Sequence, residues 1–280
     1  MRKPEVVLTD LAFGESPRWH DGRLWFANWG TGEVLAVDLG GRGEVVAQLP
    51  APTIPISLDP LPDGRMLVVD GPNAALLRRE PDGSLVRHAD LSGVGEMFNE
   101  IVVDARGNAY VNGGSSDFSQ PSIIALVTPD GGVREVAGDI AFGNGMAITP
   151  DGATLIVAES WAQRLTAFTV GPDGSLGERR VWAELGAGTP DGICLDAAGA
   201  VWYADVPNQN CVRVAEGGAV LDTVQLDRGG FACALGGPDL RTLYVLAAEF
   251  HGFDTMEADI AARTGQLLAV TVDVPGAGRS

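Results

Sequence analysis

A phrase that recurs six times is the feature that most restricts the fold of this 280-residue chain. Each copy combines a turn, usually built on Asp or Gly, with a following extended apolar run, as in residues 20–26. The equivalent turn positions are residues 22, 64, 107, 152, 199 and 240, which lie 42, 43, 45, 47 and 41 residues apart. Repeats of this length with several short strands are typical of four-stranded propeller blades. The repeats therefore predict an all-β protein, a six-bladed β-propeller that forms one domain over residues 1–280.

The two ends of the chain together complete the sixth repeat. Its last predicted strand, residues 266–270, has no outer strand after it, whereas residues 5–8 form an extended segment that belongs to no other repeat. We expect this N-terminal strand to close the last blade, because the closure removes the exposed edge that an open sheet leaves. Only residues 255–263 are predicted to form a helix, with Thr255 as the N-cap and Gly265 as the stop.

Composition restricts the class of partner. The formal net charge of −18 argues against nucleic acid and against anionic membrane surfaces, because like charges repel. No stretch approaches the roughly 18 apolar residues that span a bilayer, and no apolar run follows the charged N-terminus as in a signal peptide. The three cysteines lack metal-binding spacing and are expected to be buried thiols. We expect a cytoplasmic protein with a small-molecule substrate, and the sequence leaves monomer and dimer open.

The repeat register also predicts a site. In a propeller the inner strands line a central channel, so counting back seven or eight residues from each turn position gives one channel residue per blade. These residues are Glu15, Ser57, Asn99, Asn144, Asp191 and Ala232. Two carboxylates and two carboxamides thus meet near the axis. Oxygen donors of this kind suit a hard cation such as calcium, and the absence of nearby His or Cys argues against a dedicated zinc site.

An ordinary structural role is the alternative for each of these residues, because Asp and Asn before Gly are common in turns. The tripeptide Pro-Asp-Gly occurs six times in the chain, and five copies fall in predicted turns. The copy at residues 190–192 differs, because it begins a predicted inner strand and is followed by a separate turn. Agreement among several blades favours a site over a set of unrelated turns.

Four short segments, in this order along the chain, resemble one known family. They are residues 14–19 (GESPRW), 98–100 (FNE), 144–147 (NGMA) and 190–196 (PDGICLD). The chain resembles the senescence marker protein, gluconolactonase and luciferin-regenerating enzyme family of six-bladed propellers. The resemblance implies one divalent cation held by Glu15, Asn144 and Asp191, with Asn99 beside it. Calcium is the first choice, and zinc, manganese or magnesium could substitute.

The resemblance further implies a metal-dependent hydrolase that acts on a lactone, with Asp191 as the catalytic general base. Characterised relatives hydrolyse mostly sugar lactones, and some related propellers cleave organophosphates. Two alternatives stay open: a non-catalytic propeller that binds a ligand or partner on its face, and other metal-dependent chemistry such as phosphotriester cleavage or a strictosidine synthase-like condensation.

The predicted substrate contacts depart from the family pattern at two positions. The full set is Asn99, Ser57, Met97, Phe98, Glu100 and Trp161. Glu100 stands where the family usually has Asp, and Met97 stands where sugar-lactone members often have Arg. Since Phe142 and Phe231 are further candidates for the pocket wall, we expect alkyl- or aryl-substituted lactones to be better substrates than sugar lactones.

Overall fold

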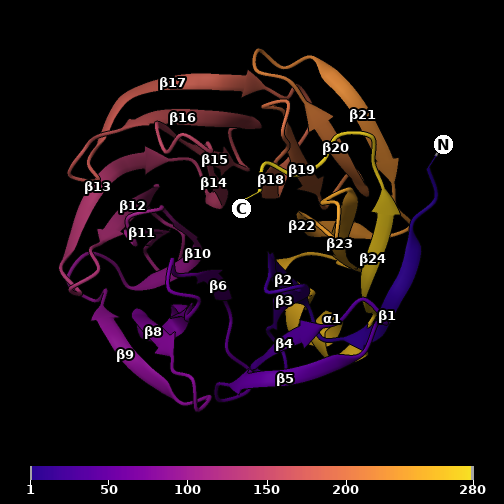
Figure 1. The fold of residues 1–280 in the computed structure, drawn as a ribbon, viewed down its shortest axis with the longest axis horizontal. Helices are drawn as coiled ribbons and strands as arrows, with labels where there is room; N and C mark the ends of the chain where they lie inside the picture. The colour runs from indigo at the N-terminus through magenta and orange to yellow at the C-terminus, as the bar shows by residue number, and fades with distance from the viewer. Residues whose placement is uncertain (1, 279–280) are drawn as a thin grey trace.

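Six four-stranded antiparallel sheets surround a central axis in the computed structural model, which describes residues 2–278 (Figure 1). Each sheet is one blade, and we number the blades along the chain and name the inner strand of each first. Blade 1 comprises β2 (Gly14–His20), β3 (Arg23–Asn28), β4 (Glu33–Val37) and β5 (Gly43–Gln48). Blade 2 comprises β6 (Ile56–Pro60), β7 (Met66–Asp70), β8 (Ala75–Arg79) and β9 (Leu85–Asp90). Blade 3 comprises β10 (Met97–Val103), β11 (Ala109–Gly114), β12 (Ser122–Val127) and β13 (Val133–Ile140).

The remaining three blades include the one that the N-terminal strand completes. Blade 4 comprises β14 (Gly143–Ile148), β15 (Thr154–Glu159), β16 (Arg164–Val170) and β17 (Leu176–Glu184). Blade 5 comprises β18 (Pro190–Leu195), β19 (Val201–Asp205), β20 (Asn210–Val214) and β21 (Val220–Gln225). Blade 6 comprises β22 (Gly229–Gly236), β23 (Thr242–Ala248), β24 (Gly265–Thr271) and β1 (Glu5–Leu11). Because β1 pairs with β24, with Glu5 opposite Ala269, the predicted propeller and its N-terminal closure are both confirmed.

The six Pro-Asp-Gly tripeptides divide into five turn copies and one strand copy, as the sequence predicted. Five of their glycines adopt a positive φ of 70–87°, which a turn requires and glycine tolerates without steric cost: Gly64, Gly83, Gly131, Gly152 and Gly174. Gly192, in the sixth copy, instead lies within the inner strand β18. Asp191 is therefore part of a strand beside the channel and not of a blade turn.

The hydrophobic core is divided among the spaces between successive blades. Between blades 2 and 3, for example, Leu67 and Val69 of one sheet pack with Ile101 and Val111 of the next, all fully buried. Equivalent clusters fill the other five spaces. This pattern follows from the sheets themselves, because each blade has two faces and both must be covered. The three cysteines are free and buried, as expected; they lie between blades 5 and 6.

The two ends of the channel differ. The segment after β24, residues 272–278, crosses the end where the inner strands finish: Ala277 donates a backbone hydrogen bond to Leu195 and Gly276 donates one to Leu240. Figure 1 accordingly shows the yellow segment after β24 running toward the centre of the ring. At the other end an insertion between β23 and β24 forms η2 (Phe253–Thr255) and α1 (Met256–Ala262).

The insertion contains the predicted short helix, and its end differs from the prediction. Thr255 is the N-cap residue, but the left-handed position that ends α1 is taken by Arg263 and not by a glycine. Gly265 already belongs to β24, where a Cβ would lie 2.6 Å from the carbonyl oxygen of Leu11. No helix within residues 2–278 is long and apolar enough to cross a membrane.

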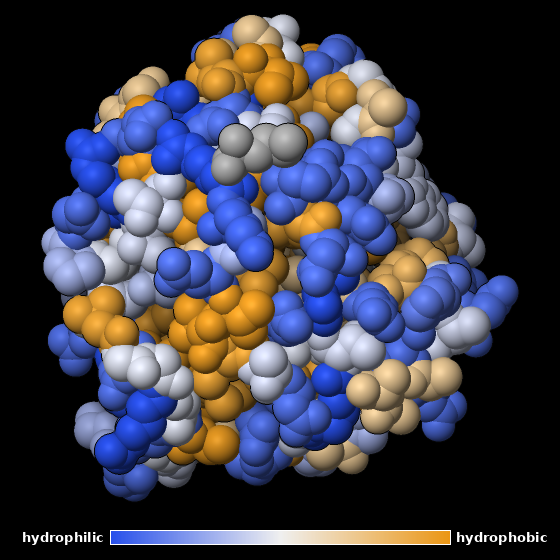
Figure 2. All heavy atoms as spheres, turned by 90° about the vertical axis from the view of Figure 1, so that its right-hand side faces the viewer, coloured by the Kyte–Doolittle hydropathy of each residue, from blue (hydrophilic) through white to orange (hydrophobic). Residues whose placement is uncertain are grey.

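The outer strands carry a mixed surface. On the side of the molecule with β1 and β21, Figure 2 shows apolar side chains scattered among hydrophilic ones. Exposed apolar residues of these strands include Val6, Val220 and Leu221. Arg2 ties the two neighbouring blades together by an ion pair with Asp222.

Candidate functional site

A cavity of about 760 Å³ opens at the end of the channel where the inner strands begin, away from the C-terminal segment. Residues from blades 1 and 3–6, and from the loop before blade 2, line it. Its volume lies within the roughly 300–1,000 Å³ that is usual for sites of drug-sized ligands. The repeat thus brings five blades and one loop to a single pocket.

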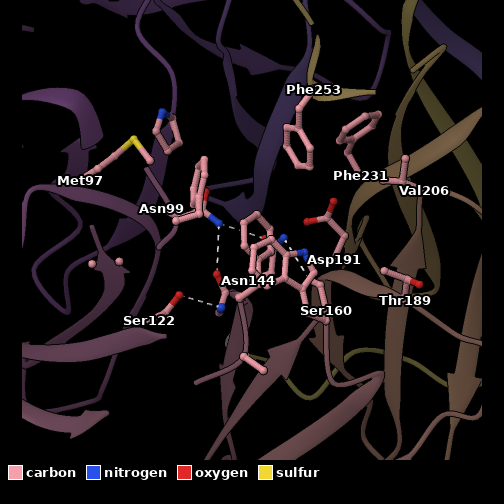
Figure 3. A pocket seen from close by; sticks show the side chains of 18 of the residues that line it. Met97, Asn99, Ser122, Asn144, Ser160, Thr189, Asp191, Val206, Phe231 and Phe253 are labelled. Carbon is pink, nitrogen blue, oxygen red and sulfur yellow. Dashed lines mark hydrogen bonds between the residues drawn. The ribbon is translucent and has the colours of Figure 1, made fainter. Parts of the chain in front are cut away.

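Four of the six residues predicted from the register lie together at this cavity. Glu15, Asn144 and Asp191 each occupy the second position of an inner strand, in β2, β14 and β18, and Asn99 occupies the third position of β10. Figure 3 shows Asn99, Asn144 and Asp191 around the same space. Equivalent positions in different blades therefore bring two carboxylates and two carboxamides to the axis.

Glycines after two of these residues allow the inner strands to approach closely. A Cβ on Gly145 would lie 2.5 Å from the backbone nitrogen of Ile193 and 2.7 Å from the carbonyl oxygen of Asp191. A Cβ on Gly192 would lie 2.6 Å from the Cβ of Ala232. All three distances are shorter than real Cβ atoms show, so glycine at these positions lets β14, β18 and β22 converge.

The two carboxyl groups of the site lie near each other; Glu15 is buried and Asp191 is half-buried. Burial raises the pKa of Glu15 well above its ordinary value, and the negative charges of Asp191 and Glu100 raise it further. Burial likewise raises the pKa of Asp191, with contributions from Glu100 and Asp205. The Oε2 atom of Glu15 accepts a hydrogen bond from the backbone of Ser16 at 3.0 Å, but Asp191 Oδ1 is buried without any hydrogen-bond partner. An unpartnered buried carboxylate oxygen is rare and requires an explanation.

Hydrogen bonds hold the carboxamides in place. Asn99 Nδ2 donates to Asn144 Oδ1 at 3.2 Å, and Asn144 Nδ2 donates to Ser160 Oγ at 3.5 Å. Ser160 in turn donates to the carbonyl oxygen of Pro190, next to Asp191, at 2.7 Å. The orientation of Asn144 is thereby linked to blades 3 and 5.

Two residues of this arrangement were missed by sequence reasoning. Ser160 follows β15, and Asn112 in β11 donates from Nδ2 to the carbonyl oxygen of Asn144 at 2.5 Å. Both lie on or just after the second strand of a blade. The register of the second strands could have indicated them, since these strands run beside the inner strands that carry the site.

The remaining predicted contacts divide into two groups. Met97, Phe98 and Trp161 line the cavity. Ser57 and Glu100, also predicted as substrate contacts, are not among the residues that line the cavity. Ser57 is buried, and Ile54 and Pro55 from the preceding loop line the cavity instead.

Glu100 is withdrawn from the cavity because a buried arginine binds it. Arg18 NH2 donates to Glu100 Oε2 at 3.1 Å, and Arg18 Nε donates to Asp59 Oδ1 at 2.6 Å. All three side chains are buried. Burial raises the pKa of Asp59 to about 6, against the opposing influence of Arg18 and of the backbone N–H of Val103. This ion-pair group joins blades 1, 2 and 3 behind the site.

The donor set fits a hard divalent cation. Among residues 2–278 no group of three or more His, Cys, Asp or Glu side chains is placed to hold a metal ion, so carboxamide oxygens would have to complete the coordination. Calcium accepts such mixtures of carboxylate and amide oxygens. The unpartnered Asp191 Oδ1, beside a second carboxylate, is what such an ion would satisfy.

Comparison with known proteins places the chain in a family. Residues 13–249 match the sequence model described as the SMP-30/Gluconolactonase/LRE-like region. The chain belongs to this family. The resemblance carried by the four sequence segments is thereby confirmed.

Individual proteins similar to this SMP-30/gluconolactonase-like chain are consistent with that family. It is 34% identical to a 6-deoxy-6-sulfogluconolactonase of Pseudomonas putida over 145 residues, a match that spans half of each chain. It is 26% identical to a pentonolactonase of Haloferax volcanii over 100% of this chain and 97% of the relative. A crystal structure of a calcium-binding protein, regucalcin, from Agrobacterium tumefaciens superposes with a TM-score of 0.82 at 23% identity, covering 98% of this chain and 95% of that one, which shows the shared fold.

Proposed function

We propose that this SMP-30/gluconolactonase-like protein hydrolyses lactones with the aid of one divalent cation, calcium being the first choice. Glu15, Asn144 and Asp191 would hold the cation, and Asn99 would lie beside it. The observation that carries the proposal is the buried, unpartnered Oδ1 of Asp191 at the floor of a cavity that also contains Glu15. Two relatives named as lactonases support the reaction class.

The reaction requires a water molecule to attack the carbonyl carbon and the ring ester bond to break. A bound divalent cation supplies Lewis acidity for the carbonyl oxygen and lowers the pKa of water. Asp191 would accept the proton that the attacking water loses and return it to the alkoxide that leaves the ring. The product is a hydroxy acid, so atoms and protons balance.

The carboxamides position the substrate in this proposal. Asn99 lines the cavity, and its Nδ2 group donates to Asn144 Oδ1. This hydrogen bond fixes the orientation of each amide group relative to the other. An amide N–H directed at the ester oxygens of a bound lactone would stabilise the negative charge that develops on them. Ser160 and Asn112 act as positioning residues, because they hold Asn144 and the backbone next to Asp191.

Calcium binding and hydrolysis should be measured on the same preparations. The purified chain is treated with a chelator, titrated with Ca²⁺ by calorimetry, and assayed with a panel of lactones before and after the titration. Asp191→Asn and Glu15→Gln should weaken Ca²⁺ binding at least about tenfold. Asp104→Asn is the matched control, because Asp104 is also buried but its carboxylate is hydrogen-bonded within its own turn, outside the cavity lining.

The results separate the candidate functions. Lactone hydrolysis that is lost with the chelator and restored by Ca²⁺ supports the proposal, and hydrolysis that persists without any metal contradicts it. Ca²⁺ binding without turnover of any lactone would favour the non-catalytic binding propeller. Turnover of a phosphotriester in place of lactones would favour the other metal-dependent chemistry.

A further inference from the structure

Four aromatic side chains that line the cavity lie in contact with one another. Phe253, in the insertion of blade 6, has its ring centroid 6.4 Å from that of Phe118 and 6.2 Å from that of Phe142. Phe142 stacks on Trp161 at 4.6 Å with an interplanar angle of 15°. We call Phe118, Phe142, Trp161 and Phe253 the aromatic roof. Since blades 6 and 3 face each other across the axis, the roof extends from one side of the channel to the other.

Three of the four rings of the aromatic roof are exposed, so the roof is available to a ligand and is not part of the hydrophobic core. Phe118, Trp161 and Phe253 are 44%, 60% and 61% exposed, whereas aromatic rings of a core are fully buried. Phe142 adopts a φ of +59°, a conformation that is rare for a bulky residue. Exposed apolar groups gathered at a cavity mouth mark a binding surface.

The floor of the cavity, formed by Asn99, Asn144 and Asp191, is polar, whereas the aromatic roof is largely apolar. Among the described residues that line the cavity, Glu15 and Asp191 are the only charged ones, and none is Lys, Arg or His. An anionic substituent would therefore find no basic side chain in the cavity lining to pair with. The side chains of Met97, Phe142 and Phe253 supply no hydrogen-bond donors, so a hydroxyl group held against them would lose its hydrogen bonds to water without replacement. The donors in the lining, such as Ser119 and Gln120, lie beside these apolar groups. Figure 3 shows Met97 on one side of the cavity and Phe231 and Phe253 on another.

We propose that the substrate is an uncharged lactone that carries an apolar substituent, alkyl or aryl. This inference rests on the proposed lactonase function and names its substrate class. The lactone ring lies against the polar floor formed by Asn99, Asn144 and Asp191. The substituent lies against the aromatic roof, where its burial also removes exposed ring surface from water.

Three lactones test the preference on the Ca²⁺-loaded chain: δ-decalactone, δ-valerolactone, which lacks the alkyl chain, and glucono-δ-lactone. We expect kcat/KM for δ-decalactone to exceed both other values by about tenfold or more. Phe253→Ala should reduce the ratio of δ-decalactone to δ-valerolactone about fivefold. Leu39→Ala is the control, because Leu39 is 62% exposed but lies in an outer turn of blade 1.

A binding measurement separates this inference from the proposed reaction. The δ-lactams with and without the same pentyl chain have the shape of the two alkyl lactones but resist hydrolysis, so their dissociation constants can be compared whether or not the chain is an enzyme. Tighter binding of the pentyl lactam by about tenfold, reduced in Phe253→Ala, supports the apolar substituent site even if no lactone is hydrolysed. Equal binding of the two lactams, or a preference for glucono-δ-lactone in the hydrolysis assay, overturns it.

Discussion

Replacing Arg18 by Met tests whether the buried ion-pair group behind the site stabilises the propeller. The Arg18 side chain is 5% exposed, and those of Asp59 and Glu100 are 2% and 7% exposed. Its guanidinium also donates to the carbonyl oxygens of Ile101 at 2.7 Å and Pro17 at 3.0 Å. Met fills a similar space but leaves two buried carboxylates without a cation. Loss of one partner from a buried pair costs about 3–5 kcal/mol in the free energy of unfolding, a large share of the roughly 5–15 kcal/mol that stabilises a typical protein.

The pH dependence of this loss has a definite sign. Burial already raises the pKa of Asp59 to about 6 with Arg18 present, and burial raises the pKa of Glu100 as well. Without Arg18 both values rise further, so the folded variant binds protons that the unfolded chain does not. Its stability is then highest at low pH and decreases as pH rises through the folded pKa values. The difference from the wild type should therefore grow from pH 6 to pH 8.

Urea unfolding at pH 6, 7 and 8 measures the effect. Arg23→Met is the matched control, because Arg23 lies on the neighbouring strand and pairs with the exposed Glu44, so we expect it to change the unfolding midpoint little. A triple variant that adds Asp59→Asn and Glu100→Gln should recover part of the loss. A change below about 1 kcal/mol in Arg18→Met, or one independent of pH, would refute the reasoning.

Three further variants address packing, charge and specificity. Gly145→Ala should weaken Ca²⁺ binding about tenfold and destabilise the fold by about 1–3 kcal/mol, because its Cβ would push β14 away from the backbone of β18; calorimetry and urea unfolding measure the two effects. Glu159→Gln should cost about 1–3 kcal/mol at pH 7, because Glu159 is fully buried and bound by Arg164 and Arg179. Although burial alone would raise it, hydrogen bonds from Arg164, the backbone N–H of Ala141 and Thr166 hold the pKa of Glu159 below its ordinary value. The difference from the wild type should therefore shrink as pH falls through that pKa in acid unfolding experiments. Met97→Arg should shift the ratio of kcat/KM toward glucono-δ-lactone, because a guanidinium at the cavity wall supplies donors for hydroxyl groups; an unchanged ratio would mean that position 97 does not contact the substrate.

The repeat register predicted the floor of the site well, because it depends only on equivalent positions in equivalent strands. Glu15, Asn144 and Asp191 all lie second in their inner strands, and Asn99 lies one position later. Ser57 is also second in its strand but does not line the cavity, whereas Ile54 and Pro55 of the loop before β6 do. A register reports which residues are equivalent along the strands, but it does not report what a preceding loop covers.

Glu100 shows a different limit. Its neighbour Asn99 lines the cavity, but Glu100 itself turns to Arg18, which comes from another blade. A local motif cannot predict this outcome, because the choice between cavity and ion pair depends on which cation the adjacent blades bring within reach. The pairing satisfies a buried charge that would otherwise be costly.

The sequence by itself therefore determined the number of blades, their closure by the N-terminal strand and the residues that meet on the axis. These features depend on local turns and on strand alternation, which repeat along the chain. Only the tertiary structure decided which polar residues face the cavity and that the four rings of the aromatic roof lie together. Those rings come from segments far apart in sequence, and ring closure alone brings blade 6 opposite blade 3. Contacts of that kind depend on how six sheets pack around an axis, and no local pattern in the chain records them.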